Sequence, residues 1–408
     1  MLYTLAIYLY ALGVMLASPF NKKARTMLKG QRETFRKLKR EIDKNSRYVW
    51  FHAASLGEFE QGRPLMERFR RDYSEYKILL TFFSPSGYEV RKNYDGADIV
   101  CYLPFDTPGN VFRFFHLVRP EMALFIKYEF WMNYIVACHH YRIPFYSVSS
   151  IFRSNKIFFR WYGQVYAHVL KYVTHFFVQD EKSRHLLAKR GLVDNVTVVG
   201  DTRFDRVIDI ANQAKHLPLV EKFCEGASFV LVAGSSWPPD EGLINPYFNI
   251  HPDMKLILAP HVIDEHHLSQ IEHKLQRPTL RYTEATEENV RQADCLIINC
   301  YGLLSSIYRY GHVAYVGGGF GVGIHNVAEA AVYGIPVLIG PNNKNFREAQ
   351  DLLRMGGCFE ITGQTLFNAV MDRVMNDSEL RRQRGNICRD YIVSNAGASD
   401  VIFQTLGV

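Results

Sequence analysis

Residues 47–62 read RYVWFHAASLGEFEQG and decide the fold. The apolar run Arg47–His52 has the composition of a buried strand, and a helical pattern of apolar residues follows the small-residue turn. Glu58 stands in that turn. Because the carboxyl ends of strands in an open α/β sheet face the ligand crevice, Glu58 is a candidate general base. An acidic residue in the first turn of a helix also complements the helix dipole, and this stretch alone leaves both interpretations open.

Short apolar runs of the same kind alternate with helical patterns along the whole chain. Continuous apolar runs of this length are typical of parallel strands buried on both faces, and strand–helix alternation implies right-handed βαβ units. The sequence therefore predicts two doubly wound, Rossmann-like α/β domains facing a central crevice. The expected strands cover residues 48–55, 77–83, 99–103, 122–127, 144–148, 174–178, 196–200, 229–234, 255–259, 295–299, 313–317 and 336–340.

Composition sets the expected boundaries. We expect an N-terminal domain over residues 48–205, a polar linker without strands over 206–226, and a C-terminal domain over 227–408. The last helix, about residues 378–406, could cross back to the first domain.

The N-terminus pairs an apolar segment with a basic one. Residues 1–21 carry no charge, whereas residues 22–47 hold eleven Lys and Arg against three Asp and Glu, a net +8 in a chain of net charge +7. About twenty helical residues reach across one bilayer core, and a following basic run places the body on the cytoplasmic side. We expect residues 1–21 to be a membrane anchor or interfacial helix and residues 22–47 a basic membrane-proximal segment; a buried N-terminal helix is the alternative. Because the basicity is confined to one segment and no recognition motif is present, we expect no nucleic-acid partner.

The second half places glycines where strands meet helices. Gly317, Gly318 and Gly319 follow an apolar run and precede a predicted helix, so their amides could approach a phosphate closely. Glu329, one turn into that helix, could accept hydrogen bonds from ribose hydroxyls. A tight-packing loop with a surface glutamate is the alternative, although His325 and Asn326 make the loop polar. These glycines come late in their domain, which disfavours a dinucleotide fingerprint.

Two further loops of the second half are candidates for binding a phosphate. Ser235 and Ser236 follow the first run of the second domain, and the alternative for them is a helix cap. Asn345 lies in the loop after residues 336–340, where a simple turn is the alternative.

The first half offers a second carboxylate at a strand end. Glu129 follows the run 122–127, and the adjoining Phe130 and Trp131 could exclude water from it and raise its pKa. A glutamate at a helix start beside core aromatics is the alternative. Arg153, after the run 144–148, could face an anionic substrate.

Taken together, these motifs resemble the 3-deoxy-D-manno-octulosonic acid (Kdo) transferases of lipopolysaccharide synthesis. They occur in the order of that family over nearly the whole chain, and the ordered set is specific although no single piece is. The matching pieces are SLGE (55–58), TFFSPSG (81–87), YEFW (128–131), GDTRFD (200–205), AGS (233–235), VGG (316–318), HNVAE (325–329), and GP (340–341) through NFRE (345–348).

The resemblance implies a GT-B fold, CMP-Kdo as donor and a lipid A precursor (lipid IVA) as acceptor. It makes the N-terminal domain the acceptor-binding domain and the C-terminal domain the CMP-sugar-binding domain. Glu58 matches the proposed catalytic base, and Glu129 matches a second required glutamate. Expected anion contacts are Arg153 and Arg203. Expected donor-binding residues are Ser235, Ser236, His261, Gly317, Gly318, Gly319, His325, Asn326, Glu329 and Asn345.

The chain departs from the family pattern at several of these positions. His261 and Val262 replace the Arg and His of a Pro-Arg-His motif, and Ile324 replaces one glycine of the loop. Arg203 and Asp201 replace a lysine and an asparagine. These changes affect the expected phosphate and Kdo contacts and leave both glutamates in place.

The implied reaction is inverting glycosyl transfer. Glu58 would deprotonate an acceptor hydroxyl, which attacks the anomeric carbon of Kdo while the CMP phosphate leaves, stabilised by amides of the second domain. We expect no cofactor and no metal, and a location at the cytoplasmic face of the inner membrane. The alternatives are another GT-B nucleotide-sugar transferase or epimerase, and a membrane-anchored nucleotide- or lipid-binding protein without catalysis.

Overall fold

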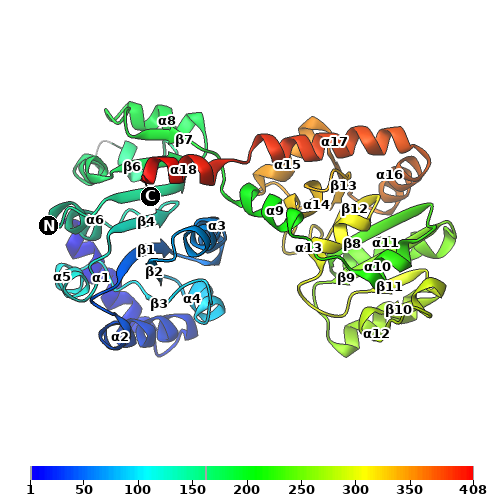
Figure 1. The fold of residues 1–408 in the computed structure, drawn as a ribbon, viewed down its shortest axis with the longest axis horizontal. Helices are drawn as coiled ribbons and strands as arrows, with labels where there is room; N and C mark the ends of the chain where they lie inside the picture. The colour runs from blue at the N-terminus through cyan, green and yellow to red at the C-terminus, as the bar shows by residue number, and fades with distance from the viewer. Residues whose placement is uncertain (1, 161–162, 408) are drawn as a thin grey trace. The chain divides into compact units, whose positions relative to one another are not determined.

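Two parallel sheets of seven strands form the frame of the chain (Figure 1). The computed structural model describes residues 2–160 and 163–407. It divides into unit 1, residues Met1–Asp205 and Gly397–Val408, and unit 2, residues Arg206–Ala396. Each unit is a doubly wound, Rossmann-like α/β domain, which confirms the predicted fold class.

The sheet of unit 1 has the strand order β3-β2-β1-β4-β5-β6-β7, with every pair parallel. The strands are β1 (Arg47–Ala53), β2 (Tyr76–Phe82), β3 (Ile99–Tyr102), β4 (Met122–Ile126), β5 (Phe145–Ser150), β6 (His175–Val178) and β7 (Val196–Val198). The helices are α1 (Leu2–Ala17), α2 (Lys22–Glu41), α3 (Leu56–Asp72), α4 (Pro85–Arg91), α5 (Pro108–Leu117), α6 (Met132–His140), α7 (Gln164–Ala167), α8 (Glu181–Ala188) and α18 (Ala398–Leu406), with α9 (Arg203–Asn212) starting at its end.

Both faces of this sheet are buried, as the continuous apolar runs predict. Trp50 points into a core with residues of α2, α5 and α6, whereas its neighbours Val49 and Phe51 point into a core with residues of α3 and α18. Successive side chains of a strand alternate between the two faces, so residues 48–51 of β1 are all apolar.

The sheet of unit 2 has the order β10-β11-β9-β8-β12-β13-β14, again parallel throughout. The strands are β8 (Phe229–Ser236), β9 (Met254–Pro260), β10 (Thr279–Arg281), β11 (Cys295–Ile297), β12 (Val313–Val316), β13 (Val337–Ile339) and β14 (Cys358–Glu360). The helices are α10 (Pro218–Cys224), α11 (Pro238–Ile250), α12 (Glu265–Lys274), α13 (Leu304–Ile307), α14 (Ala328–Ala331), α15 (Arg347–Met355), α16 (Gln364–Asn376) and α17 (Ser378–Ser394).

The twelve predicted strands are all present, but the sequence did not predict β10 and β14. Both are three-residue strands at the two edges of the unit 2 sheet, and β10 is only half-buried. An edge strand needs no continuous apolar run, so its sequence carries little signal.

The prediction of one long final helix was wrong. It breaks after Ser394, and Gly397, with φ +96°, precedes α18. Helix α18, red in Figure 1, belongs to unit 1, where Phe403 packs 4.9 Å from Phe69 between ring centroids. The stretch 206–226, expected as a linker, carries most of α9 and all of α10.

Helices α1 and α2 form the N-terminal part of unit 1. Helix α2 packs on the body through Phe35 and Leu38, whereas α1 leaves most of its large apolar side chains exposed. The Tyr3 hydroxyl ties α1 to the body, since it donates to Asp106 Oδ2 at 2.6 Å. None of the helices in the described ranges is by itself long and apolar enough to cross a membrane; α1 and α2, bent by 119° at their break, pass that test only as a pair.

Candidate functional site

Both sheets reverse their strand order at one point, and several of the candidate residues lie there. In unit 1 the reversal lies between β1 and β4, whose carboxyl ends lead to Glu58 and Glu129. In unit 2 it lies between β8 and β12, which lead to Ser235 and Gly317. Ligands of open α/β sheets bind outside the strand carboxyl ends at such a point.

Glu58 lies in the first turn of α3 and is half-buried. Ser55, at the N-cap position, uses its hydroxyl to donate to Glu58 Oε2 instead of capping the helix. The carboxylate is therefore both a dipole-complementing residue and a group at a strand end, so the two interpretations of the sequence describe one position.

Glu129 is enclosed by polar donors as well as by aromatic rings. Its side chain is 12% exposed, and its Oε2 accepts a hydrogen bond from Trp131 Nε1 at 2.7 Å. His52 Nε2, from β1, lies 3.3 Å from the same oxygen. Phe130 turns away from the carboxylate into the core, 5.4 Å from Phe152 between ring centroids.

The sequence did not single out His52. A polar side chain at a position that alternation directs into the core is the signal that could have identified it, because buried polar groups need partners.

The backbone just before Glu129 is strained and firmly held. Lys127 has φ +63°, its N–H donates to Val148 O at 2.8 Å, and its carbonyl accepts from Ser150 Oγ at 3.0 Å. Ser149, on the adjacent β5, has φ +51°. Such conformations persist only where the surroundings fix them, and they cluster at functional sites.

The expected anion contacts of unit 1 differ in their surroundings. Arg203 pairs with Asp201 at 2.9 Å, and Asp201 accepts from Gln61 Nε2, one turn beyond Glu58 in α3, at 3.0 Å. The GDTRFD segment therefore lies beside α3. Arg153 is exposed after β5.

In unit 2, two positions of the glycine loop lie so close to other backbone segments that only glycine fits there. A Cβ on Gly317 would lie 2.3 Å from Ser235 O, and one on Gly319 would lie 2.6 Å from Gly340 Cα. The Gly317 amide donates to Gly234 O and the Gly318 amide to Asp240 Oδ2, both at 2.9 Å. Close packing therefore requires these glycines, and the protein itself occupies the Gly317 and Gly318 amides. The role of the loop in donor binding stays a prediction.

The helix after this loop is short. Helix α14 has four residues, Ala328–Ala331, and Glu329 in it accepts from Asn326 Nδ2 at 3.0 Å. The exposed Asn326 and the half-buried Glu329 therefore form one polar pair at the β12 side of the site.

The two serines after β8 point to different surroundings. Ser236 is fully buried, and its hydroxyl donates to Glu241 Oε1 at 2.9 Å. Glu241 Oε2 lies 2.9 Å from His267 Nε2. Ser236 thus builds the base of the site, whereas Ser235, half-buried with φ +52°, stays at its surface.

Three rings stack beside these serines. Trp237 lies 4.7 Å from His261 and His261 lies 4.5 Å from His325, measured between ring centroids. Trp237 Nε1 donates to His325 Nε2 at 3.3 Å. Burial and the neighbouring His261 lower the pKa of His325. Asn345 lies exposed in the loop after β13.

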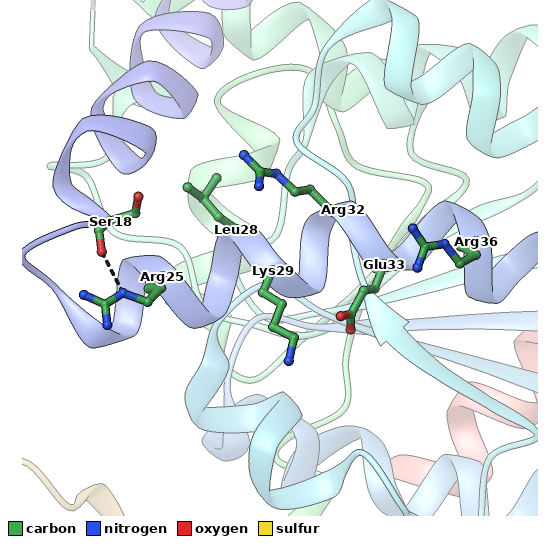
Figure 2. A pocket seen from close by; sticks show the side chains of 7 residues that line it. All are labelled: Ser18, Arg25, Leu28, Lys29, Arg32, Glu33 and Arg36. Atoms are coloured by element: carbon green, nitrogen blue, oxygen red, sulfur yellow. Dashed lines mark hydrogen bonds between the residues drawn. The ribbon is translucent and has the colours of Figure 1, made fainter.

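A cationic groove lies along α2, next to the exposed apolar helix α1. Its volume is about 350 Å³, and Figure 2 shows its lining side chains on α2, with Ser18 in the turn between α1 and α2. Arg25 bridges the two helices, since its Nε donates to Ser18 O at 3.2 Å. The groove is lined by Ser18, Arg25, Leu28, Lys29, Arg32, Glu33 and Arg36.

Within residues 2–160 and 163–407, no group of three His, Cys, Asp or Glu side chains is arranged to hold a metal ion.

Solved structures with this fold include nucleotide-sugar enzymes. The UDP-GlcNAc 2-epimerase from Neisseria meningitidis aligns with a TM-score of 0.58 at 16% identity, over 88% of this chain and 99% of that one. MurG from Acinetobacter baumannii aligns with a TM-score of 0.56 at 10% identity, over 88% and 99%. At these identities the likeness establishes the two-domain GT-B fold alone.

The sequence comparisons point to one kind of enzyme. The family model described as 3-deoxy-D-manno-octulosonic-acid transferase (kdotransferase) matches residues 29–206. The 3-deoxy-D-manno-octulosonic acid transferase of Aquifex aeolicus is 29% identical, over 78% of this chain and 83% of that protein. The enzyme of the same name from Haemophilus influenzae is 24% identical, over 88% and 86%. The chain is similar over most of its length to the 3-deoxy-D-manno-octulosonic acid transferases, which are glycosyltransferases.

Proposed function

We propose that the chain transfers Kdo from CMP-Kdo to a lipid A precursor, lipid IVA, with inversion at the anomeric carbon. The observation that carries this proposal is the pair of carboxylates at the strand-order reversal of unit 1. Glu58 and Glu129 follow adjacent parallel strands, so both lie at the edge where an α/β sheet binds its ligand.

Glu58 is the proposed base of this reaction. The Ser55 hydroxyl orients its carboxylate at the start of α3. It would take the proton of an acceptor hydroxyl as that oxygen attacks Kdo, a contribution of about 10²–10⁴-fold.

Unit 2 is the proposed donor site. Its reversal point between β8 and β12 offers Ser235, the Trp237–His261–His325 rings, and the Asn326–Glu329 pair. Polar and aromatic groups of this kind suit a nucleotide, with the hydroxyl and imidazole donors toward its phosphate and the carboxylate toward ribose. We assign Arg153 and Arg203 to the anionic groups of Kdo and of the acceptor.

The direct experiment incubates the protein with CMP-Kdo and lipid IVA and weighs the lipid by mass spectrometry. We expect a product heavier by one or more Kdo residues, with release of CMP. An unchanged lipid mass with folded protein refutes the proposal.

The epimerase alternative has a specific observation behind it, since a UDP-sugar epimerase shares the fold. A thermal-shift comparison of CMP with UDP separates the two. Stabilisation by CMP agrees with Kdo transfer, whereas stabilisation by UDP alone favours the epimerase class. Catalytic turnover itself excludes a binding protein without activity.

We further propose that α1 and the cationic groove hold the enzyme on the cytoplasmic face of the inner membrane. Leu9 and Leu16 of α1 are 60% and 66% exposed, and the adjoining groove gathers four cations and one carboxylate. An exposed apolar helix beside a net positive surface suits an anionic bilayer.

Vesicle sedimentation tests the membrane proposal with matched variants. Leu9→Asp should weaken binding to vesicles with anionic lipid several-fold. Val193→Asp, which alters an equally exposed residue elsewhere in unit 1, should not. The proposal is contradicted if the two variants bind anionic vesicles equally well, or if neither variant distinguishes anionic from neutral vesicles.

A further inference from the structure

The pair His52–Glu129 fixes the position of one proton. His52 lies on β1 with a fully buried side chain, packed 4.7 Å from the Phe125 ring between centroids. Both of its ring nitrogens have partners: Nδ1 faces Thr81 on β2, and Nε2 faces Glu129. A neutral imidazole has one donor and one acceptor nitrogen, so these partners determine its tautomer.

Two contacts require the proton on Nδ1. Nδ1 lies 3.0 Å from Thr81 O, a backbone carbonyl that only accepts. It also lies 2.9 Å from Thr81 Oγ1, whose hydroxyl donates to Phe51 O at 3.2 Å and accepts from Trp50 Nε1 at 2.9 Å. Since the hydroxyl proton is already used, Nδ1 is the donor in both contacts.

The other side of the ring then needs a second proton. Nε2 lies 3.3 Å from Glu129 Oε2, and an unprotonated Nε2 facing a carboxylate would place two lone pairs against each other. A proton between them removes this conflict, either on Nε2 as an imidazolium or on Oε2 as a carboxylic acid. In both forms the pair is neutral overall, which suits its burial, because an unpaired buried charge is costly.

We propose that His52 and Glu129 share one proton, so that Glu129 serves as the proton-bearing carboxyl of the site while Glu58 is the bare base. His52 is a positioning residue that keeps this proton at Glu129 Oε2, and Trp131 Nε1 fixes the same oxygen from the other side. This inference rests on the proposed Kdo transfer and gives Glu129 its part in it: to transfer this proton to an anionic oxygen of the bound substrate, which leaves Glu129 as a carboxylate and His52 as a neutral imidazole. Two carboxyl groups that differ in protonation divide the roles of acid and base.

Spectroscopy tests the proton without any substrate. In protein labelled with ¹⁵N-histidine, the NMR signals that disappear in His52→Asn are those of His52. Their ¹⁵N chemical shifts report which ring nitrogens carry protons. The infrared C=O stretch reports a protonated carboxyl. An imidazolium, or an Nδ1–H tautomer with a carboxyl band that disappears in Glu129→Gln, supports the proposal. An Nε2–H tautomer, or an Nδ1–H tautomer without a carboxyl band, overturns it.

Kinetics of the whole enzyme provide the second test. His52→Asn keeps an amide able to bond Thr81 O but holds no proton for Glu129. Its kcat should fall about 10²-fold at pH 8 with little change in KM, since proton donation of this kind contributes about 10²–10⁴-fold. The loss should become smaller as the pH is lowered, because solvent protons then replace the proton that His52 no longer holds at Glu129.

A double-mutant cycle and a matched histidine complete the design. The double variant His52→Asn, Glu129→Gln should be no slower than Glu129→Gln alone, because the two residues act as one unit. His175→Asn, which removes another strand histidine bonded to Thr197, should leave the pH profile unchanged. Additive losses, or a His52→Asn defect equal at every pH, overturn the proposal. Inactivity of the unmodified enzyme with CMP-Kdo would instead refute the proposed function and leave the spectroscopic result standing.

Discussion

The two sheets share one topology and differ in what they place at the point where the strand order reverses. Unit 1 places Glu58 and Glu129 there, with His52 behind them. Unit 2 places glycines, Ser235 and a stack of rings. The same scaffold therefore carries carboxylates and a buried imidazole in one unit and small, hydroxyl and ring side chains in the other, so the two units differ in their loops and not in their fold.

The two sites also differ in how their backbones are held. Unit 1 holds a strained lysine, Lys127, by hydrogen bonds from the neighbouring strand. In unit 2, Gly317 and Gly319 have no side chain, which lets them lie close to the backbone of Ser235 and Gly340. We therefore expect substitutions in unit 1 to change rate, and substitutions in the glycine loop of unit 2 to change donor binding and stability together.

The largest expected effect is that of Glu58→Gln. Removal of the proposed base should lower kcat by about 10²–10⁴-fold with Tm nearly unchanged, since the helix keeps its N-cap residue. Steady-state kinetics with CMP-Kdo and lipid IVA measure it. Glu67→Gln, which removes a carboxylate from the exposed part of the same helix, is the control and should retain full activity. Near-normal turnover of Glu58→Gln would refute its role as base.

A smaller effect, in the other unit, is expected from Gly317→Ala. The new Cβ would lie 2.3 Å from Ser235 O and 2.7 Å from Ser236 Cα, so the backbone must shift. We expect a loss of about 1–3 kcal/mol of stability and a rise in the Kd for CMP of about tenfold or more. Gly321→Ala, in the same loop with open space around it, is the matched control. Calorimetric titration with CMP measures the Kd of both variants. Equal Kd values would show that the loop does not contribute to the donor site.

A third difference between the units is that the stability of unit 2 is expected to depend on pH through His267. Burial opposes protonation of His267, but hydrogen bonds to Glu241 and to Val262 O raise its pKa above the ordinary value. The folded chain therefore holds this proton more tightly than the unfolded chain. The resulting stability is complete below the unfolded pKa and is lost as the pH rises through the folded pKa.

Urea unfolding between pH 6 and pH 9 measures this dependence. We expect the stability of unit 2 to decline with rising pH, followed through a fluorinated Trp237, the unit's one tryptophan. His267→Gln should make the decline less steep. His266→Gln, which alters the exposed residue just before it, should not. A slope unchanged in His267→Gln would contradict the assignment.

The sequence predicted those parts of the molecule that depend on local pattern. Buried parallel strands need apolar residues at every position, so the twelve predicted runs were found as strands, and Glu58 and Glu129 followed from their places after β1 and β4. The half-exposed edge strand β10 lacked that pattern.

Partners that come from distant segments could not be predicted. The contact of His52 with Glu129 spans 77 positions, and the Gly318 amide is occupied by Asp240, 78 positions away. The inward orientation of Ser236 likewise depends on Glu241 and, through it, on His267. Hydrogen bonds of this kind arise only once the strands are in register.

The smallest expected effect concerns helix α1, in the N-terminal part of unit 1. Tyr3→Phe removes the hydroxyl that donates to Asp106 Oδ2, a carboxyl whose pKa burial raises to about 7. We expect a loss of about 1 kcal/mol, because one neutral donor is removed while the Asn133 and Tyr134 amides still serve Asp106. Hydrogen exchange should rise in α1 and remain unchanged in β1 and β4. Faster exchange throughout unit 1 would instead show that α1 contributes to the stability of the whole domain.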